Sequence, residues 1–141
     1  MSKILFPNEV ILENDYFKVA QDWEIPIPAF FIISAKSRIV SITEFTTEEL
    51  NEFIQTAAKV RRAMKEVLKI KDVYFFQNED SEHGFHLWLF PRLDWMEKFG
   101  RKIESVRPIM EYARDNMNNE NDLRQVLQAV QQLKSFFNQA S

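Results

Sequence analysis

The sequence predicts an α+β fold in which helices cover an antiparallel sheet of about five strands. Strand-like segments come first, one long amphipathic segment separates them, and two more amphipathic segments follow, so the predicted order is β-β-β-α-β-β-α-α. Short strands joined by tight polar turns pair antiparallel. Only two glycines occur in 141 residues and no Pro/Gly/Ser-rich linker interrupts the chain, which favours a single domain over residues 1–141.

Three short strands are predicted before the first long helix. Residues 10–12 and 16–19 are strand-like, and Glu13, Asn14 and Asp15 between them suit a tight turn, so we expect a hairpin. The continuous apolar run at residues 29–33 is typical of a strand buried on both faces.

A long helix is predicted from Thr46 onward. Thr46 and Glu49 fit a capping box, in which each side chain bonds the backbone N–H of the other residue. Beyond the cap, apolar residues recur at helical spacing opposite a charged face, so this stripe is expected to pack on the sheet. The stripe consists of Leu50, Phe53, Ile54, Ala57, Val60, Met64 and Val67 or Leu68.

Two more strands and two more helices are predicted after this helix. Residues 72–76 and 85–90 have the composition of strands and bracket a polar loop, and Pro91 is expected to end the second strand or to confine it to a sheet edge. Pro108 is placed to be the first residue of a helix that runs to about residue 117. Asn119 or Asn121 is expected to cap a last amphipathic helix.

The composition excludes several classes of protein. Hydrophobic residues make up 45% of the chain and thirteen are Phe, which predicts a folded protein with a Phe-rich core. A formal net charge of −3 gives no global attraction to nucleic-acid backbones, although a small nucleotide needs only a local site. The absence of Cys excludes disulfides, thiolate catalysis and Cys-based zinc sites. No apolar run is long enough to span a membrane, and we expect a cytoplasmic protein.

Both histidines of the chain lie in one short run, which makes it the first candidate for chemistry. The run is Glu82-His83-Gly84-Phe85-His86-Leu87-Trp88-Leu89-Phe90-Pro91-Arg92. In a strand, side chains alternate between faces, which puts Phe85, Leu87 and Leu89 on one face and Gly84, His86, Trp88 and Phe90 on the other. Taken alone, a histidine between aromatic residues on a strand is more often a core residue than a ligand-facing one.

The run resembles the signature of the histidine triad (HIT) superfamily of nucleotide hydrolases and transferases, which has three histidines at alternate strand positions, often followed by Pro-Arg. Aligned through Pro91-Arg92, the three positions fall on Gly84, His86 and Trp88, so only the central histidine remains, and in the family it is the nucleophile. The resemblance keeps the family's order from about residue 8 to residue 92. It includes Asn14-Asp15, Asp22, Pro28-Ala29-Phe30-Phe31-Ile32-Ile33-Ser34-Ala35-Lys36, Thr46-Thr47-Glu48-Glu49-Leu50 and Asn78.

The chain also departs from the family's pattern. A frequent Gly-His before the apolar strand is Ala29-Phe30 here, and the loop before the histidines, which usually carries a Gly-Gln-Ser/Thr phosphate cradle, is shorter. The resemblance implies a HIT-like fold with its core at about residues 8–95 and a C-terminal helical extension at about residues 96–141.

The resemblance also implies a function and its residues. His86 is expected to attack the α-phosphate of a purine nucleotide, in a dinucleoside polyphosphate or a nucleoside phosphoramidate. Asp22 would accept hydrogen bonds from the ribose, Trp23 would line the base and Asn78 would contact ribose or phosphate. Weaker candidates for phosphate are Ser81 and Arg92. The family commonly forms homodimers, so a nucleotide and a second copy of the chain are the expected partners, with no metal, other cofactor or nucleic acid.

The imidazole side chain of His86 is chemically suited to attack phosphorus. A neutral imidazole can attack phosphorus and form a phosphoramidate, provided that an acceptor holds its other nitrogen and fixes the tautomer. In the family that acceptor is the backbone carbonyl of the first triad position, which is Gly84 here. The indole of Trp88 does not titrate near neutral pH, so it cannot replace a histidine as an acid, and His83 is the available substitute.

Three alternatives stay open at the level of sequence. The missing first and third histidines favour a catalytically impaired module that binds a nucleotide or a protein. A transferase of the sugar-1-phosphate nucleotidyl branch tolerates a third position other than histidine, although glutamine is usual there and Trp88 does not match. A divalent metal site is a minority interpretation, with ligands from Glu79, Asp80, Glu82, His83 and His86.

Overall fold

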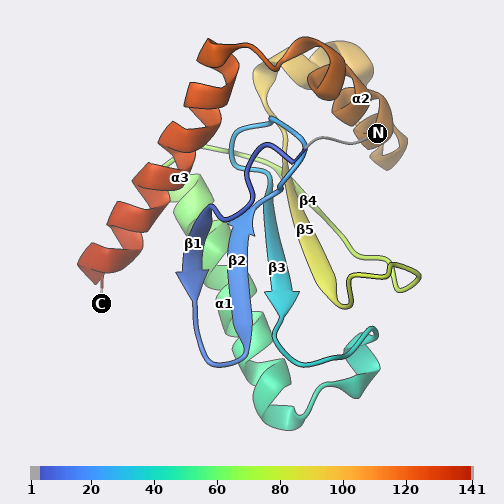
Figure 1. Ribbon diagram of the computed structural model, residues 1–141, viewed down its shortest axis with the longest axis vertical. Coiled ribbons are helices and arrows are strands. Elements are labelled where there is room, and N and C mark those ends of the chain that lie inside the picture. Colours follow the sequence, from blue (N-terminus) through green and yellow to red (C-terminus); the bar gives the residue numbers. More distant parts are fainter. Residues whose placement is uncertain (1–3, 141) are drawn as a thin grey trace.

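A computed structural model describes residues 4–140, and its five strands form one antiparallel sheet in the order β1-β2-β3-β5-β4 (Figure 1). The strands are β1 Val10–Glu13, β2 Phe17–Gln21, β3 Phe31–Ala35, β4 Val73–Phe76 and β5 His86–Pro91. The long helices are α1 Thr47–Glu66, α2 Val106–Asn116 and α3 Glu120–Ala140, and three short 3₁₀ helices are η1 Ile42–Glu44, η2 Asp94–Phe99 and η3 Ile103–Ser105. The predicted α+β class and the predicted order of the strands and long helices are confirmed.

The turn chemistry of the first hairpin is the predicted one. Asn14 Oδ1 accepts hydrogen bonds from the backbone N–H groups of Tyr16 at 3.0 Å and Phe17 at 2.8 Å, which closes the turn between β1 and β2. β3 begins at Phe31, two residues later than predicted, because Ala29 has a φ of 68° and is not extended. Pro91 is the last residue of β5 and ends that strand, while β4 occupies the sheet edge.

Helix α1 covers one face of the sheet. Its capping box is confirmed, because Thr46 Oγ1 accepts from the N–H of Glu49 and Glu49 Oε1 accepts from the N–H of Thr46. Phe53, Val60 and Met64 are buried against the sheet, whereas Leu50 and Ile54, which the stripe also included, are exposed. Ile54 follows the buried Phe53 by about 100° of helix rotation and therefore points to the flank of the helix.

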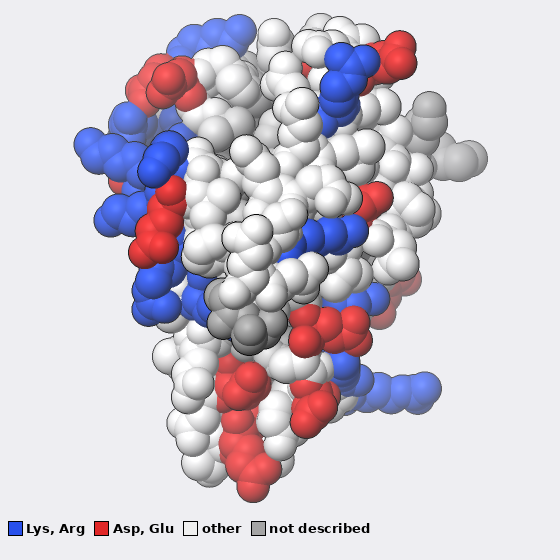
Figure 2. All heavy atoms as spheres, turned by 90° about the vertical axis from the view of Figure 1, so that its left-hand side faces the viewer, with Lys and Arg blue, Asp and Glu red and all other residues white. Residues whose placement is uncertain are grey.

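Helix α3 packs beside α1 and along β1 (Figure 1). Asn119 caps it through a hydrogen bond from the N–H of Asp122 to Oδ1 at 2.9 Å. A band without charge runs down this side of the molecule in Figure 2, where α3 exposes Leu127, Gln128, Gln131, Gln132 and Ser135. No helix within residues 4–140 is long and apolar enough to cross a membrane.

Helix α2 packs on the opposite face of the sheet from α1, at one end of it. Ile109 and Ala113 form a second buried cluster with Phe30 and Phe90. The helix begins at Val106, so Pro108 is its third residue and not its first. Proline is tolerated there because the N–H groups of the first helical turn have no partner inside the helix.

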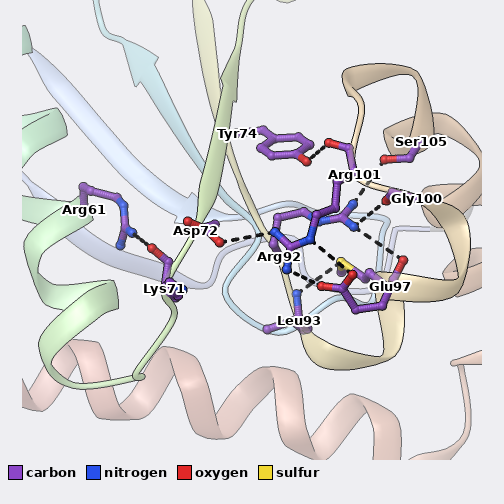
Figure 3. A network of polar contacts seen from close by, with 11 residues as sticks. Arg61, Lys71, Asp72, Tyr74, Arg92, Leu93, Glu97, Gly100, Arg101 and Ser105 are labelled. Atoms are coloured by element: carbon purple, nitrogen blue, oxygen red, sulfur yellow. Dashed lines mark hydrogen bonds and ion pairs between the residues drawn. The ribbon is translucent and has the colours of Figure 1, made fainter.

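Arg92 links the end of β5 to the segment that leads into α2 (Figure 3). Its buried guanidinium donates hydrogen bonds to Ser105 Oγ at 3.1 Å and to the carbonyl of Gly100 at 2.6 Å, and lies 5.3 Å from the centre of the Tyr74 ring. Arg101, by contrast, is exposed and forms ion pairs with Asp72 and Glu97. The buried contacts of Arg92 hold η2 and η3 against the sheet.

Candidate active site

His86 lies on the sheet face that α1 does not cover, in a hollow of about 480 Å³. The strand register places Ser34 opposite His86, Lys18 opposite Ser34 and Glu13 opposite Lys18. Directly opposed residues share a face, so these four side chains form one row across the sheet. The other residues that line the hollow are Phe6, Pro7, Asn8, Val10, Ala20, Gln21, Trp23, Ile32, Ala35, Lys36 and His83.

One hydrogen bond of the His86 ring determines its tautomer. Nδ1 lies 3.0 Å from the carbonyl oxygen of Gly84, and because a carbonyl only accepts, Nδ1 carries the proton and Nε2 the lone pair. Burial lowers the pKa of His86 below its ordinary 6.5, the charge of nearby His83 acts in the same direction, and the bond to Gly84 acts against both. His86 is therefore neutral at pH 7, with a nucleophilic nitrogen that has no hydrogen-bond partner among residues 4–140.

Gly84 supplies the predicted acceptor although it lies outside the strand. β5 begins at His86, and Gly84 has a φ of +79°, a left-handed conformation that favours glycine. A Cβ at this position would lie 3.2 Å from the carbonyl oxygen of Ile39. The turn conformation of Gly84, and not strand geometry, therefore directs its carbonyl at the imidazole.

Trp88 lies next to His86 on the same face and contacts two other parts of the site. Its indole stacks on the His86 ring, with 5.9 Å between ring centres, and on the ring of Phe76, with 5.6 Å. Its Nε1 donates a hydrogen bond to Asp22 Oδ2 at 3.3 Å. Trp88 thus helps to orient His86 and Asp22, and it supplies no group that ionises near neutral pH.

Asp22 is buried, and its carboxylate accepts three hydrogen bonds from the described residues. Burial raises the pKa of its carboxyl above the usual value, and hydrogen bonds to Oδ1 from the backbone N–H groups of Ile25 and Glu24, together with the Trp88 indole, act in the opposite direction. Oδ2 accepts only the indole N–H within the described residues, so it retains capacity for a ligand hydroxyl.

Asp22 lines a second hollow, of about 520 Å³, on the other side of Trp23 and His83. Trp23 and His83 line both hollows, with ring centres 5.5 Å apart. Other residues around the second hollow are Glu24, Ile25, Phe76, Gln77, Asn78, Trp88 and Met110. The two hollows therefore flank the pair formed by Trp23 and His83.

The remaining predicted residues lie in different places. Asn78 lines the second hollow and donates to Asp80. Ser81 lines neither hollow, and its Oγ accepts from the N–H of His83. Arg92 is six residues beyond His86 along the extended chain, roughly 20 Å away, and its side chain is buried under η2 and η3. This placement removes Arg92 from the site and gives it a structural role.

The metal interpretation gains no support from the geometry. No group of three or more His, Asp or Glu side chains within residues 4–140 is arranged to hold a metal ion. His83 is largely exposed, and its ring lies edge-on to that of His86, with 6.0 Å between centres. His83 is close enough to act on a group bound at His86 but is held by few contacts.

The sequence interpretation missed Lys18, Ser34 and Met110. Lys18 and Ser34 lie on strands whose order in the sheet brings them beside His86. No motif marks Lys18, and Ser34 stands in the segment 28–36 of the resemblance, which assigned it no role. Met110 belongs to α2, for which the sequence suggested no function. Only their position in three dimensions links these residues to the site.

Comparison with known proteins finds likeness in structure only. No family model matches the sequence, and no curated protein matches it. A zinc-bound histidine triad family protein from Mycobacterium smegmatis is 20% identical, with a TM-score of 0.59 over 92% of this chain and 88% of that one. A HIT family protein from Bacillus subtilis is 16% identical, with a TM-score of 0.57 over 82% of this chain and 92% of that one.

Diadenosine triphosphate hydrolase from Plasmodium falciparum, solved in complex with cyclomarin A, is also similar. It is 13% identical, with a TM-score of 0.62 over 93% of this chain and 77% of that one. The likeness to these three structures extends over most of the chain, including the five-stranded antiparallel sheet and its helices. The chain therefore has the fold of the histidine triad (HIT) proteins.

Proposed function

We propose that the chain is a nucleotide hydrolase or nucleotidyltransferase in which His86 attacks the α-phosphate of a purine nucleotide. The observation that carries the proposal is the bond from His86 Nδ1 to the Gly84 carbonyl, which leaves a neutral Nε2 in the hollow. The fold likeness to a diadenosine triphosphate hydrolase supports a dinucleoside polyphosphate as the first substrate to test.

The proposed reaction has two displacements. In the first, Nε2 of His86 bonds to the α-phosphorus, the bond from phosphorus to the leaving group breaks, and Nδ1 keeps its proton against Gly84. In the second, water attacks the same phosphorus, the electrons of the P–N bond return to Nε2, and the water's proton goes to solvent. The products are the leaving group, which takes the electrons of the bond broken in the first step, and a nucleoside monophosphate, and the neutral histidine is regenerated.

The other residues have proposed roles in binding. The free capacity of Asp22 Oδ2 suits a ribose hydroxyl, and the Trp23 ring beside both histidines suits contact with the base. Asn78 is proposed to contact the ribose or phosphate from the second hollow. His83 is the proposed donor for leaving groups that need a proton, and Trp88 is a positioning residue.

The direct test is incubation with diadenosine triphosphate labelled at an α-phosphate. We expect production of AMP and, on rapid quenching in alkali, label on the protein that is released by acid, as a phosphohistidine bond requires. Absence of both turnover and labelled protein would exclude the proposed chemistry.

The rate at which the nucleotide becomes bonded to His86 is expected to decrease as the pH is lowered, with a midpoint below pH 6.5. The pKa of His86 is lowered mainly by burial, so the attacking lone pair stays available to a lower pH than that of a free imidazole and is lost only as Nε2 becomes protonated. Single-turnover rates between pH 4.5 and 8 measure this limb. A midpoint at or above pH 6.5 would contradict the assignment of the limb to a buried His86.

A second candidate function is nucleotide binding without catalysis. The bond from Trp88 to Asp22 favours it, because an indole occupies the third triad position and engages the acid proposed for ribose. This candidate predicts that adenine nucleotides bind with no turnover and that His86→Ala leaves their affinity within about twofold, a difference of roughly 0.4 kcal/mol. Isothermal titration beside the labelling experiment separates the two functions.

A homodimer is the proposed assembly, and one apolar surface supports it. Ile54 is 63% exposed and Phe75, on the edge strand β4, is 46% exposed. Arg61, two helical turns beyond Ile54 on the same side of α1, bonds the carbonyls of Ile70 and Lys71 just before β4. Ile54 and Phe75 therefore lie toward the same edge of the sheet, where the strand still has unpaired backbone groups.

Phe75→Asp is expected to convert the dimer into a monomer, because it places a carboxylate in the apolar part of that contact. Light scattering after gel filtration at about 50 μM measures the mass. Leu127→Asp is the matched control, since Leu127 is 39% exposed and lies in α3, which packs along β1 at the opposite edge of the sheet from β4. A wild-type monomer, or equal effects of the two changes, would contradict this interface.

A further inference from the structure

We propose, on the basis of the function above, that Lys18 binds the phosphate chain of the leaving group and thereby selects a phosphoric anhydride over a phosphoramidate as substrate. No sequence motif marks Lys18. Its place in the row Glu13, Lys18, Ser34 and His86, and the charges around that row, carry the inference.

The geometry brings the lysine within reach of a group bound at His86. Ser34 pairs with both residues, so Lys18 and His86 lie two strands apart on one face, about 10 Å between backbones. Lys18 lines the same hollow as the imidazole, and a lysine side chain extends roughly 6 Å, so its ammonium can meet an oxyanion joined to the α-phosphorus. The hydroxyl of Ser34 lies between them.

The charges on this row leave Lys18 available. Lys36, the other lysine of the hollow, forms an ion pair with Glu13 at 2.8 Å, and this contact is the main cause that lowers the pKa of the Glu13 carboxyl. The charge of Lys18, which lies opposite Glu13, adds a smaller effect in the same direction. Lys18 takes part in no ion pair among residues 4–140.

The second hollow has the opposite character. Its lining contains Asp22 and Glu24 and neither lysine nor arginine. Glu24 is ion-paired with Arg114 at 3.2 Å, so Asp22 is the carboxylate that faces a ligand there. A chain of phosphates is repelled by Asp22 and attracted by Lys18, so it is expected to extend from His86 along the row toward β2.

The chemical nature of the leaving group then distinguishes phosphoric anhydrides from phosphoramidates as substrates. When Nε2 displaces a phosphate or polyphosphate, the leaving oxygen takes the bonding electrons and is stable as an oxyanion, so a nearby cation is sufficient. When Nε2 displaces an amine, the nitrogen must receive a proton as the bond breaks. Trp88 has no such proton to give, and His83, the proposed donor, is largely exposed and held by few contacts, whereas Lys18 supplies in the hollow the positive charge that an anhydride requires.

Nucleotide binding in a His86→Asn background, in EDTA, tests the contact without turnover. AMP has no phosphates beyond the α-phosphate and ATP has two, so isothermal titration with both isolates the extra phosphates. We expect Lys18→Gln to weaken ATP binding about tenfold and AMP binding less than about twofold, with the ATP effect shrinking at high salt. Lys65→Gln is the control, because it removes one exposed lysine from α1 on the opposite side of the sheet.

Steady-state kinetics on the protein with His86 intact give a second test. We expect kcat/KM for diadenosine tetraphosphate to exceed that for an adenosine 5′-phosphoramidate, and Lys18→Gln to reduce the ratio about tenfold. If AMP and ATP bind but Lys18→Gln affects ATP no more than Lys65→Gln, the inference is overturned and the proposed nucleophile is unaffected. If neither nucleotide binds, the proposed function is overturned as well.

Discussion

His86→Ala is expected to lower kcat/KM for diadenosine triphosphate by about 10³-fold or more and to eliminate labelled protein entirely. The reason is that no other imidazole is held in the required tautomer. His83 is exposed, and among the described residues the one ion-pair contact of its ring is from Nε2 to the Glu82 carboxylate at 3.9 Å. His86, by contrast, is hydrogen-bonded to Gly84 and stacked against Trp88. Steady-state kinetics and the labelling assay measure the loss.

His83→Ala is the matched control for this experiment. It removes the other histidine of the site, and we expect less than about a tenfold loss with an anhydride substrate, because the phosphate leaving group needs no proton. Added imidazole is expected to restore part of the activity of His86→Ala by entering the space left in the hollow. If His86→Ala retains more than about a tenth of the wild-type rate, His86 is not the nucleophile.

Arg92→Ala is expected to lower the free energy of unfolding by about 2–4 kcal/mol. The change removes buried hydrogen bonds to Ser105 and Gly100, leaves their oxygens without a donor, and opens a cavity beside the Tyr74 ring. Urea denaturation followed by tryptophan fluorescence measures the loss, and hydrogen exchange is expected to rise in η2, η3 and α2 because Arg92 holds that segment to the sheet (Figure 3).

Two further variants make this prediction specific. Arg101→Ala removes an exposed arginine of the same segment and is expected to lower the free energy of unfolding much less, because surface ion pairs contribute little to stability. The loss of unfolding free energy for Arg92→Met is expected to lie between those for Arg92→Ala and Arg101→Ala. Methionine fills the space of the arginine side chain, and the change removes a buried guanidinium, whose Nε has no hydrogen-bond partner among the described residues. Equal losses for Arg92→Ala and Arg101→Ala would contradict the structural role.

The parts of the fold that depend on short stretches of chain were predictable. The turn at Asn14, the capping box of Thr46 and Glu49, and the end of β5 at Pro91 each rest on chemistry within a few residues. The errors concern the backbone conformation of one residue and the direction of one side chain on its helix. Ala29 adopts a positive φ before β3, and Ile54 is turned away from the core that its helical stripe suggested.

The candidate site divides in the same way. Alternation along one strand was enough to predict that His86 and Trp88 share a face, and resemblance was enough to select Gly84 as the acceptor. Neither could relate Lys18 or Met110 to His86, because those relations depend on strand order and on where α2 packs. The same lack of a third dimension made Arg92 look like a phosphate ligand.

The sequence by itself determined the class of fold and the order of its elements, and its resemblance to the HIT family selected His86 as the candidate nucleophile. The fold class and the element order depend on periodicity, capping and residue chemistry, which act over one strand or one helical turn. The tertiary structure alone decided the hydrogen bond from Trp88 to Asp22 and the row of side chains that leads from His86 to Lys18. Burial, charge and hydrogen bonding in the site arise between residues distant in the chain, and only the packed sheet brings them together.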